Sequence, residues 1–283
     1  MTNKARFGPA GNAENFPHAS SLDAPAWLAS LSLSAYEYQC GRGVKIGKET
    51  AQKLGANAKA HDIALSLHAP YYINLSADDE ERIAKNINYI LQSAHAAHWM
   101  GAKRVVVHTG AAGGLDRRAA LIQAGKTLRR ALDICDAEGI TNVTLCPETM
   151  GKINQLGTLE EVLTLCADNE RLLPCVDFGH LYARSHGEAQ GLEQTAAMLD
   201  AMETAIGLER ARTLHIHFSH IEYSKGGEVR HLTLDDPRFG PDFTPLALVL
   251  KQRGYTPVFI CESAGTQAAD AAAMRQIFED SAL

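Results

Sequence analysis

Residues Leu214 to His231 read L-H-I-H-F-S-H-I-E-Y-S-K-G-G-E-V-R-H. The stretch begins with the alternation of a β-strand, in which successive side chains point to opposite faces. His215 and His217 therefore share one face, and the apolar residues around them share the other. Two imidazoles on one strand face suggest a metal site. A hydrogen-bonded core histidine next to surface histidines would give the same pattern, so the rest of the chain has to decide.

Strands of this kind recur along the whole chain. Short β-like runs alternate with helical segments, as expected of parallel βα units. The expected strands span residues 5–10, 35–40, 63–68, 104–108, 142–148, 173–177, 213–218 and 257–262. The expected helices span residues 48–61, 78–100, 116–138, 159–167, 192–206, 245–253 and 266–280. Eight strands alternating with helices predict an α/β fold of the (β/α)8 TIM-barrel type.

An open, doubly wound sheet is the alternative architecture, but no GxGxxG motif follows the first expected strand. The 283 residues contain no linker rich in Gly, Pro or Ser. Barrels of this type commonly run to about 250 residues as one domain, so we expect a single domain over residues 1–283. The N-terminal residues show no signal-peptide pattern, and no apolar run approaches the ~20 residues that cross a bilayer. We therefore expect a cytoplasmic protein.

The composition is that of an ordinary globular enzyme. Hydrophobic residues make up 46% of the chain and charged residues 21%, unlike a disordered protein. The net charge of −6 gives no overall basic surface for nucleic acid, although bound divalent cations would reverse the sign locally. The cysteines show no CxxC spacing, so we expect reduced core residues rather than disulfides or a zinc site. They are Cys40, Cys135, Cys146, Cys166, Cys175 and Cys261.

Residues that bind divalent metals stand at the ends of six consecutive strands. In a (β/α)8 barrel, chemistry gathers at the C-terminal ends of the strands. From the third strand to the eighth, these ends carry His68, His108, Glu148, Asp177 with His180, His217 and Glu262. One such residue is ordinary, but six in succession at one edge indicate a metal site. A mixed set of imidazoles and carboxylates suits zinc or manganese, and more than four ligands implies more than one ion.

Several short motifs follow one another in a specific order and spacing. They are His68-Ala69-Pro70-Tyr71-Tyr72-Ile73-Asn74-Leu75, Val107-His108-Thr109-Gly110, Pro147-Glu148-Thr149, Asp177-Phe178-Gly179-His180, His217, His231 and Cys261-Glu262-Ser263. Together they resemble the endonuclease IV family, also called AP endonuclease family 2, which lies within the xylose-isomerase-like TIM barrels. The resemblance covers most of the chain, and its departures mark a divergent member.

The resemblance implies a barrel that holds three divalent ions, usually zinc. The ligands of the first ion would be His68, His108 and Glu148. Those of the second would be Glu148, as a bridge, with Asp177, His217 and Glu262. The third ion would be held by His180 and His231.

The resemblance also implies an activity. The protein would be an apurinic/apyrimidinic endonuclease that hydrolyses the phosphodiester 5′ of abasic sites in double-stranded DNA, as a DNA repair enzyme and a monomer. A metal-bridging hydroxide would attack the phosphorus, and the damaged nucleotide would be flipped out of the duplex. Tyr71 matches a position that the family places against DNA. Arg42 and Lys45, after the second strand, offer phosphate contacts, with a solvated turn as the alternative.

The chain departs from the family pattern around the third ion. Val229 stands where the family has an aspartate two residues before the last histidine. Glu228 is adjacent, but in an extended segment it would point to the other face. We therefore expect either that His220 or Glu222 completes the third site or that this site is weak or empty. His215 is expected to lie deeper in the barrel than His217, as a core residue or a partner of the ligands.

A sugar isomerase or epimerase with one divalent metal is the alternative function. Such enzymes occur in the same superfamily, and their site resembles Glu148, Asp177, His217 and Glu262. Glu148 and Glu262 would then be catalytic, as the acid and base that move a proton next to a sugar carbonyl. The additional imidazoles favour the hydrolase, while Val229 and the acidic net charge favour the sugar enzyme. A third possibility is a barrel that binds a ligand without catalysing a reaction. Such a protein would be expected to have lost metal-ligand residues of the first two sites, whereas this chain retains them.

Overall fold

Eight parallel strands form one sheet in the computed structural model, which describes residues 4–167 and 169–281. The order of the strands is β1-β10-β7-β6-β5-β4-β3-β2. Their bounds are β1 Arg6–Pro9, β2 Ala35–Gln39, β3 Ala64–His68, β4 Arg104–His108, β5 Thr144–Glu148, β6 Cys175–Asp177, β7 His215–Phe218 and β10 Val258–Cys261. All eight expected strands are present, each shorter than expected by at most two residues at either end.

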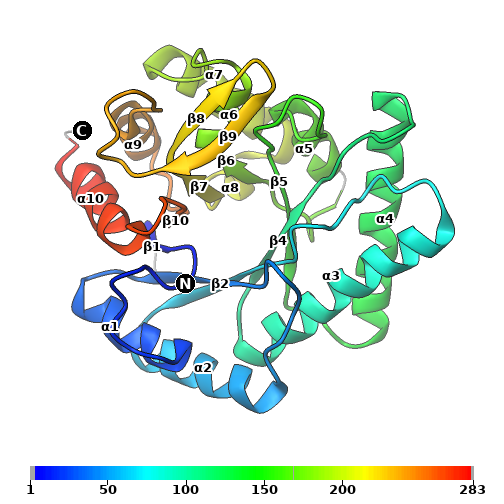
Figure 1. Ribbon diagram of the computed structural model, residues 1–283, viewed down its shortest axis with the longest axis horizontal. Helices are drawn as coiled ribbons and strands as arrows, with labels where there is room; N and C mark the ends of the chain where they lie inside the picture. The colour runs from blue at the N-terminus through cyan, green and yellow to red at the C-terminus, as the bar shows by residue number, and fades with distance from the viewer. Residues whose placement is uncertain (1–3, 168, 282–283) are drawn as a thin grey trace.

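The sheet closes almost completely on itself where β1 meets β2. The backbone N–H of Gly11 donates to the carbonyl of Glu37 at 2.9 Å, and that of Ser34 donates to the carbonyl of Phe7 at 2.9 Å. Helices cover the outside of the strands (Figure 1). The predicted (β/α)8 TIM barrel is therefore confirmed.

The seven expected helices are all present. They are α2 Lys48–Ala60, α3 Glu80–Met100, α4 Arg117–Ala137, α5 Leu159–Ala167, α7 Leu192–Ile206, α9 Phe243–Gln252 and α10 Gln267–Asp280. Capping fixes their starts: the side chain of Asp79 accepts from the N–H of Arg82 at the start of α3, and Asp116 caps α4 in the same way. Ile83, Ile87 and Ile90 lie on one face of α3 and are buried, since helical positions three or four apart share a face.

Further elements lie outside the expected pattern, among them a 3-10 helix at Ser21–Asp23, three short α-helices and a hairpin. The short α-helices are α1 Ala24–Ser30, α6 Phe178–Arg184 and α8 Leu208–Ala211. The hairpin is antiparallel and consists of β8 His220–Ser224 and β9 Gly227–Leu232, which continue directly from β7. Its tip is joined to the loop after β5, because the N–H of Ile153 donates to the carbonyl of Gly226 at 3.1 Å. Figure 1 shows the hairpin in yellow beside the barrel strands.

The strands of the barrel are buried. Val105, Val106 and Val107 on β4 are fully buried, as expected of a strand covered on both faces. All six cysteines are free and buried, so the predicted reduced core cysteines are confirmed. No helix in the described part of the chain is long and apolar enough to cross a membrane.

Gly8 allows β1 to approach β2. A Cβ atom at this position would lie 1.7 Å from the carbonyl oxygen of Ala35 on β2, so any side chain forces the two strands apart. We expect Gly8→Ala to lower the free energy of unfolding by about 3 kcal/mol or more, because the clash is with backbone rather than with a movable side chain. Urea denaturation measures this change.

Gly114→Ala is the matched control, because a Cβ there meets nothing within 4 Å. Its free energy of unfolding should stay within about 1 kcal/mol of the unsubstituted protein. If Gly8→Ala unfolds at the same urea concentration as this control, closure of the barrel does not require a glycine.

Candidate metal centre

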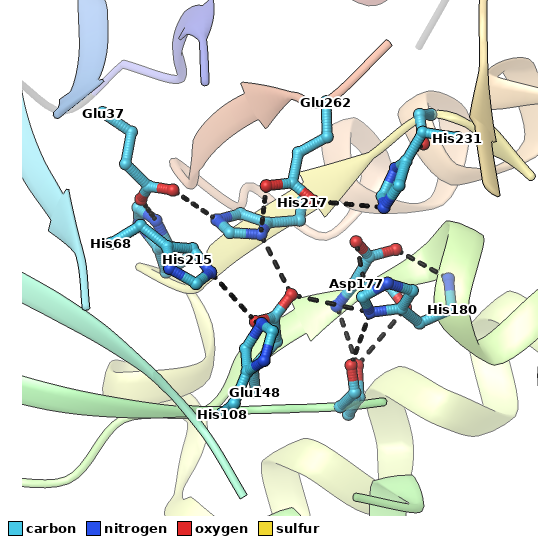
Figure 2. A network of polar contacts seen from close by, with 12 residues as sticks. Glu37, His68, His108, Glu148, Asp177, His180, His215, His217, His231 and Glu262 are labelled. Atoms are coloured by element: carbon cyan, nitrogen blue, oxygen red, sulfur yellow. Dashed lines mark hydrogen bonds and ion pairs between the residues drawn. The ribbon is translucent and has the colours of Figure 1, made fainter. Parts of the chain in front are cut away.

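A pocket of about 500 Å³ opens at the C-terminal ends of the strands. Its lining includes His68, His108, His180, His231 and Glu262. Glu148, Asp177 and His217 lie fully buried beneath these residues. All eight residues that the sequence predicts as ligands therefore gather in one place, and Figure 2 shows them turned toward one another.

Glu148, at the end of β5, is the residue around which the others are arranged. Its Oε2 lies 3.4 Å from Nε2 of His68 and 3.2 Å from Nε2 of His108. Its Oε1 lies 3.2 Å from Nδ1 of His217 and 3.5 Å from Nδ1 of His180. Burial alone would raise the pKa of Glu148, but the contacts with His108, His217 and His68 hold it well below its ordinary value. The carboxylate is therefore ionised.

Asp177 and Glu262 complete the acidic part of the site. Asp177 ends β6 and caps α6, since its Oδ1 accepts from the backbone N–H of His180 at 2.7 Å. Glu262 directly follows β10, and its Oε1 lies 3.5 Å from Nδ1 of His217. Burial opposes ionisation of Glu262, but the charges of His217 and His231 lower its pKa to about 2. Burial raises the pKa of Asp177 and is only partly offset by His180.

Two carboxylate oxygens in the site lack hydrogen bonds. Among the described residues, Oε2 of Glu148 and Oδ2 of Asp177 are buried without a hydrogen-bond partner. Leaving such atoms unsatisfied costs about 1–3 kcal/mol each, and more for charged groups. A divalent cation bound between the carboxylates and imidazoles would satisfy both oxygens. The residues present therefore fit a metal.

Three of the imidazoles direct Nε2 into the site, because their Nδ1 atoms are hydrogen-bonded to groups outside it. Nδ1 of His68 lies 2.7 Å from the carbonyl of Ala69, and Nδ1 of His180 lies 2.8 Å from the carbonyl of Thr149. Since a carbonyl only accepts, both Nδ1 atoms donate a proton to it, and Nε2 is the nitrogen of each ring that could bind an ion. Nδ1 of His231 pairs with Oγ of Ser219 at 2.8 Å. Such partners orient ligand histidines in metal sites.

The side chains form three adjacent groups that could each hold an ion. In each group the ligand atoms lie within 4.8 Å of one another. The first is His68, His108 and Glu148; the second is Glu148, Asp177, His217 and Glu262; the third is His180, Glu228 and His231. The first two groups have the membership that the family resemblance implies. The third contains an additional carboxylate, Glu228.

The expectation that Glu228 points away from the site is wrong. In the hairpin Tyr223 pairs with Glu228 and Glu222 pairs with Arg230, so Val229 is an extra residue on β9. Such a β-bulge shifts the alternation of side chains by one position. Oε2 of Glu228 consequently lies 3.5 Å from Nε2 of His180, whereas Val229 is half exposed.

The other two candidates for the third group have different partners. Nδ1 of His220 faces the carbonyl of Asp236 at 3.1 Å. Glu222 accepts from Nε of Arg230 at 2.7 Å. The place of Glu228 also explains the glycine opposite it, because a Cβ on Gly151 would lie 2.6 Å from the Cβ of Glu228.

Tyr71 and Arg42 lie near the rim of the pocket. The ring of Tyr71 is half exposed, and its centroid lies 5.0 Å from that of His68 and 5.4 Å from that of His108. Its hydroxyl donates to Oε1 of Gln39 at 3.0 Å. Arg42 is exposed in the neighbouring loop and is not part of the pocket lining.

Sequence relatives include an uncharacterized protein and an endonuclease. An uncharacterized protein of Methanocaldococcus jannaschii is 36% identical over 236 residues, which cover 83% of this chain and 84% of that protein. Endonuclease 4 of Thermus thermophilus is 30% identical over 189 residues, which cover 61% of this chain and 64% of that protein. The sequence match to this endonuclease thus spans somewhat less than two thirds of each chain.

Solved structures with a similar fold include an endonuclease and an epimerase-like protein. Endonuclease IV from Thermus thermophilus superposes with a TM-score of 0.72 at 22% identity, over 97% of this chain and 99% of that chain. A D-tagatose 3-epimerase-like protein superposes with a TM-score of 0.66 at 20% identity, over 88% of each chain. At these identities the likeness concerns the fold alone.

The family model described as xylose isomerase-like TIM barrel matches residues 25–279. This range contains every strand except β1 and all residues of the three groups. The chain therefore belongs to the family of xylose isomerase-like TIM barrels.

Proposed function

We propose that the protein is a metal-dependent phosphodiesterase that cleaves DNA on the 5′ side of abasic sites, in the manner of endonuclease IV. The observation that carries the proposal is the presence of three adjacent groups of ligand-type side chains, two of which share Glu148. Neighbouring divalent ions can stabilise both the attacking and the leaving oxygen of a phosphodiester. The sequence relative named endonuclease 4 adds support.

The residues beyond the second group separate this proposal from the sugar enzyme. Glu148, Asp177, His217 and Glu262 would suffice for one metal. A one-metal isomerase has no chemical use for the pair His68 and His108, or for the third group on the other side of Asp177. The buried carboxylates of the cluster carry several negative charges, and several cations would neutralise these charges better than one.

The chain's own residues have distinct parts in the proposed reaction. Bound zinc or manganese would supply Lewis-acid stabilisation of the charge on the phosphodiester oxygens. Glu148 and Glu262 fix the positions of the imidazoles on both sides of the second group. The exposed ring of Tyr71 offers a surface for stacking against a nucleotide at the pocket rim. Arg42, in the adjacent loop, offers a contact to the DNA backbone.

A sugar epimerase with one metal is the second candidate, and one observation favours it. The second group alone contains two glutamates, Glu148 and Glu262, on either side of His217. Two carboxylates that flank a metal could remove and return a proton next to a sugar carbonyl. The D-tagatose 3-epimerase-like protein has the same fold.

The metal content of the protein distinguishes the two functions. We expect two or three equivalents of zinc or manganese per chain in protein purified without added metal, measured by elemental analysis. The same preparation should incise a duplex that carries one abasic site, and EDTA should abolish incision because the ligands alone have no activity. A single equivalent without incision would instead support the epimerase, and ketoses would then be screened as substrates.

His108 tests the first group. We expect His108→Ala to lower the incision rate by roughly 100-fold or more, because the substitution removes one of the three ligands of the first ion. An epimerase that uses only the second group would keep its activity. His95→Ala is the control, since His95 is a surface residue whose Nε2 pairs with Glu138 at 2.7 Å. An unchanged incision rate in His108→Ala would show that the first ion takes no part in the reaction.

Glu228 tests the third group. Glu228→Ala should lose about one equivalent of bound metal at a fixed free zinc concentration, because two imidazoles remain where three ligands stood. Val229→Ala is the matched control: it alters the neighbouring residue, whose side chain is half exposed and outside the group. Equal metal content in the two variants would show that Glu228 is not a ligand.

A further inference from the structure

A second carboxylate lies behind His217, on the side away from Glu148. Glu37 is in the middle of β2 and has no exposed surface. Its Oε1 lies 3.1 Å from Nε2 of His217. The imidazole is thus placed between two acidic groups, with Nδ1 directed to Glu148 and Glu262 and Nε2 directed to Glu37 (Figure 2). None of the three ligand-type groups proposed above contains Glu37.

The other contacts of Glu37 hold its carboxylate in place. Oε2 accepts from the hydroxyl of Ser66 at 2.8 Å and lies 2.8 Å from Nε2 of His215. Oε1 accepts from the side-chain amide of Gln39 at 3.2 Å. Nδ1 of His215 faces the guanidinium of Arg104 at 3.4 Å, and a guanidinium can only donate. The ring proton of His215 is therefore on Nε2, where it is donated to Glu37.

The contacts of Glu37 also indicate which nitrogen of His217 is protonated. A carboxylate only accepts hydrogen bonds, and Oε1 of Glu37, at 3.1 Å, faces Nε2 of His217. Among the described residues this buried Nε2 forms no hydrogen bond of regular geometry, so Glu37 is the acceptor placed against it. Nε2 of His217 consequently carries a proton.

His217 thus differs from the other imidazoles in the nitrogen that it offers. His68 and His180 have Nδ1 bound to a backbone carbonyl and present Nε2. His217 has Nε2 held by Glu37 and presents Nδ1 to Glu148 and Glu262. We propose that Glu37 is a positioning residue, which fixes the tautomer and ring orientation of His217 so that Nδ1 can bind the ion of the second group. This inference rests on the metal centre of the proposed function, but not on its DNA substrate.

The space behind His217 is less suited to a metal of its own. Cys175, His215 and His217 have ligand-type atoms within 4.8 Å of one another. However, the positive guanidinium of Arg104 faces His215 there. The role of this region is therefore to support the imidazole.

Glu37→Gln tests the proposal through zinc affinity. The amide has one oxygen, which the fixed N–H of His215 would occupy, so its NH2 group would face Nε2 of His217. His217 would then move its proton to Nδ1 and lose the lone pair that binds the ion. We expect the affinity of one zinc equivalent to fall by roughly 10- to 100-fold, with the other equivalents unchanged. Titration against a chromophoric chelator, with the unsubstituted protein in parallel, measures each equivalent.

Two controls separate positioning from a general structural effect. Glu203→Gln makes the same change at a glutamate of α7 that pairs with Arg253 and Tyr255 and lies outside the pocket lining, and all zinc affinities should stay within about threefold. Circular dichroism of the EDTA-treated proteins shows whether each variant folds. If Glu37→Gln does not fold, Glu37→Asp replaces it: the shorter side chain keeps the charge but withdraws it from His217, and the same equivalent should weaken.

The possible results are decisive. Selective weakening of one equivalent supports the positioning role. Unchanged affinities in a folded Glu37 variant overturn it, as does an equal loss in all equivalents, which would indicate a structural role. If the unsubstituted protein itself binds no zinc tightly, the metal centre of the proposed function fails, and the positioning role fails with it. Failure to incise abasic DNA, with tight zinc binding intact, contradicts only the proposed function.

Discussion

The structure depends on keeping one ionised carboxylate, Glu148, inside the end of a protein barrel. A buried charge without partners is strongly unfavourable, and removing one partner of a buried pair costs about 3–5 kcal/mol. The carboxylate is stabilised by imidazoles from β3, β4, β7 and α6, which reach it from different sides. They can do so because parallel strands of a barrel all end at the same rim. The closure of β1 on β2 and the chemistry of the site are therefore coupled, since loosening the barrel would separate the groups that compensate one another.

The parts of the site that sequence could predict are those fixed by local order along the chain. A histidine or carboxylate at the end of a strand is placed by the strand itself, so His68, His108 and Glu148 could be assigned before any coordinates. Glu228 could not, because its direction depends on a bulge, and a bulge depends on how β8 pairs with β9. Glu37 could not either, because it lies within a strand and its partner His215 is 178 residues away in the sequence. Pairing between strands, rather than residue type, limited the prediction.

The two functions considered for this chain would share its second group of side chains and differ in their use of the residues around it. The second group would serve a phosphodiesterase and a sugar epimerase equally well. The outer groups, on either side of it, are what favour cleavage of a phosphodiester over movement of a proton. The third group is assembled from α6 and the hairpin after β7, whereas the first comes from β3, β4 and β5. Function within this fold can thus change through short segments at the rim, while the barrel remains the same.

The bulge at Val229 affects what a sequence alignment of such proteins can show. An alignment compares residues column by column, and it would place Val229 in the column that holds a ligand aspartate in endonuclease IV. The chain would then be scored as having lost a ligand, although Glu228 delivers a carboxylate to the same imidazole from the preceding column. A one-residue slip in a hairpin can therefore bring a carboxylate to the same imidazole from a neighbouring position in the sequence. Homologues with an apolar residue in that column merit inspection of the position before it.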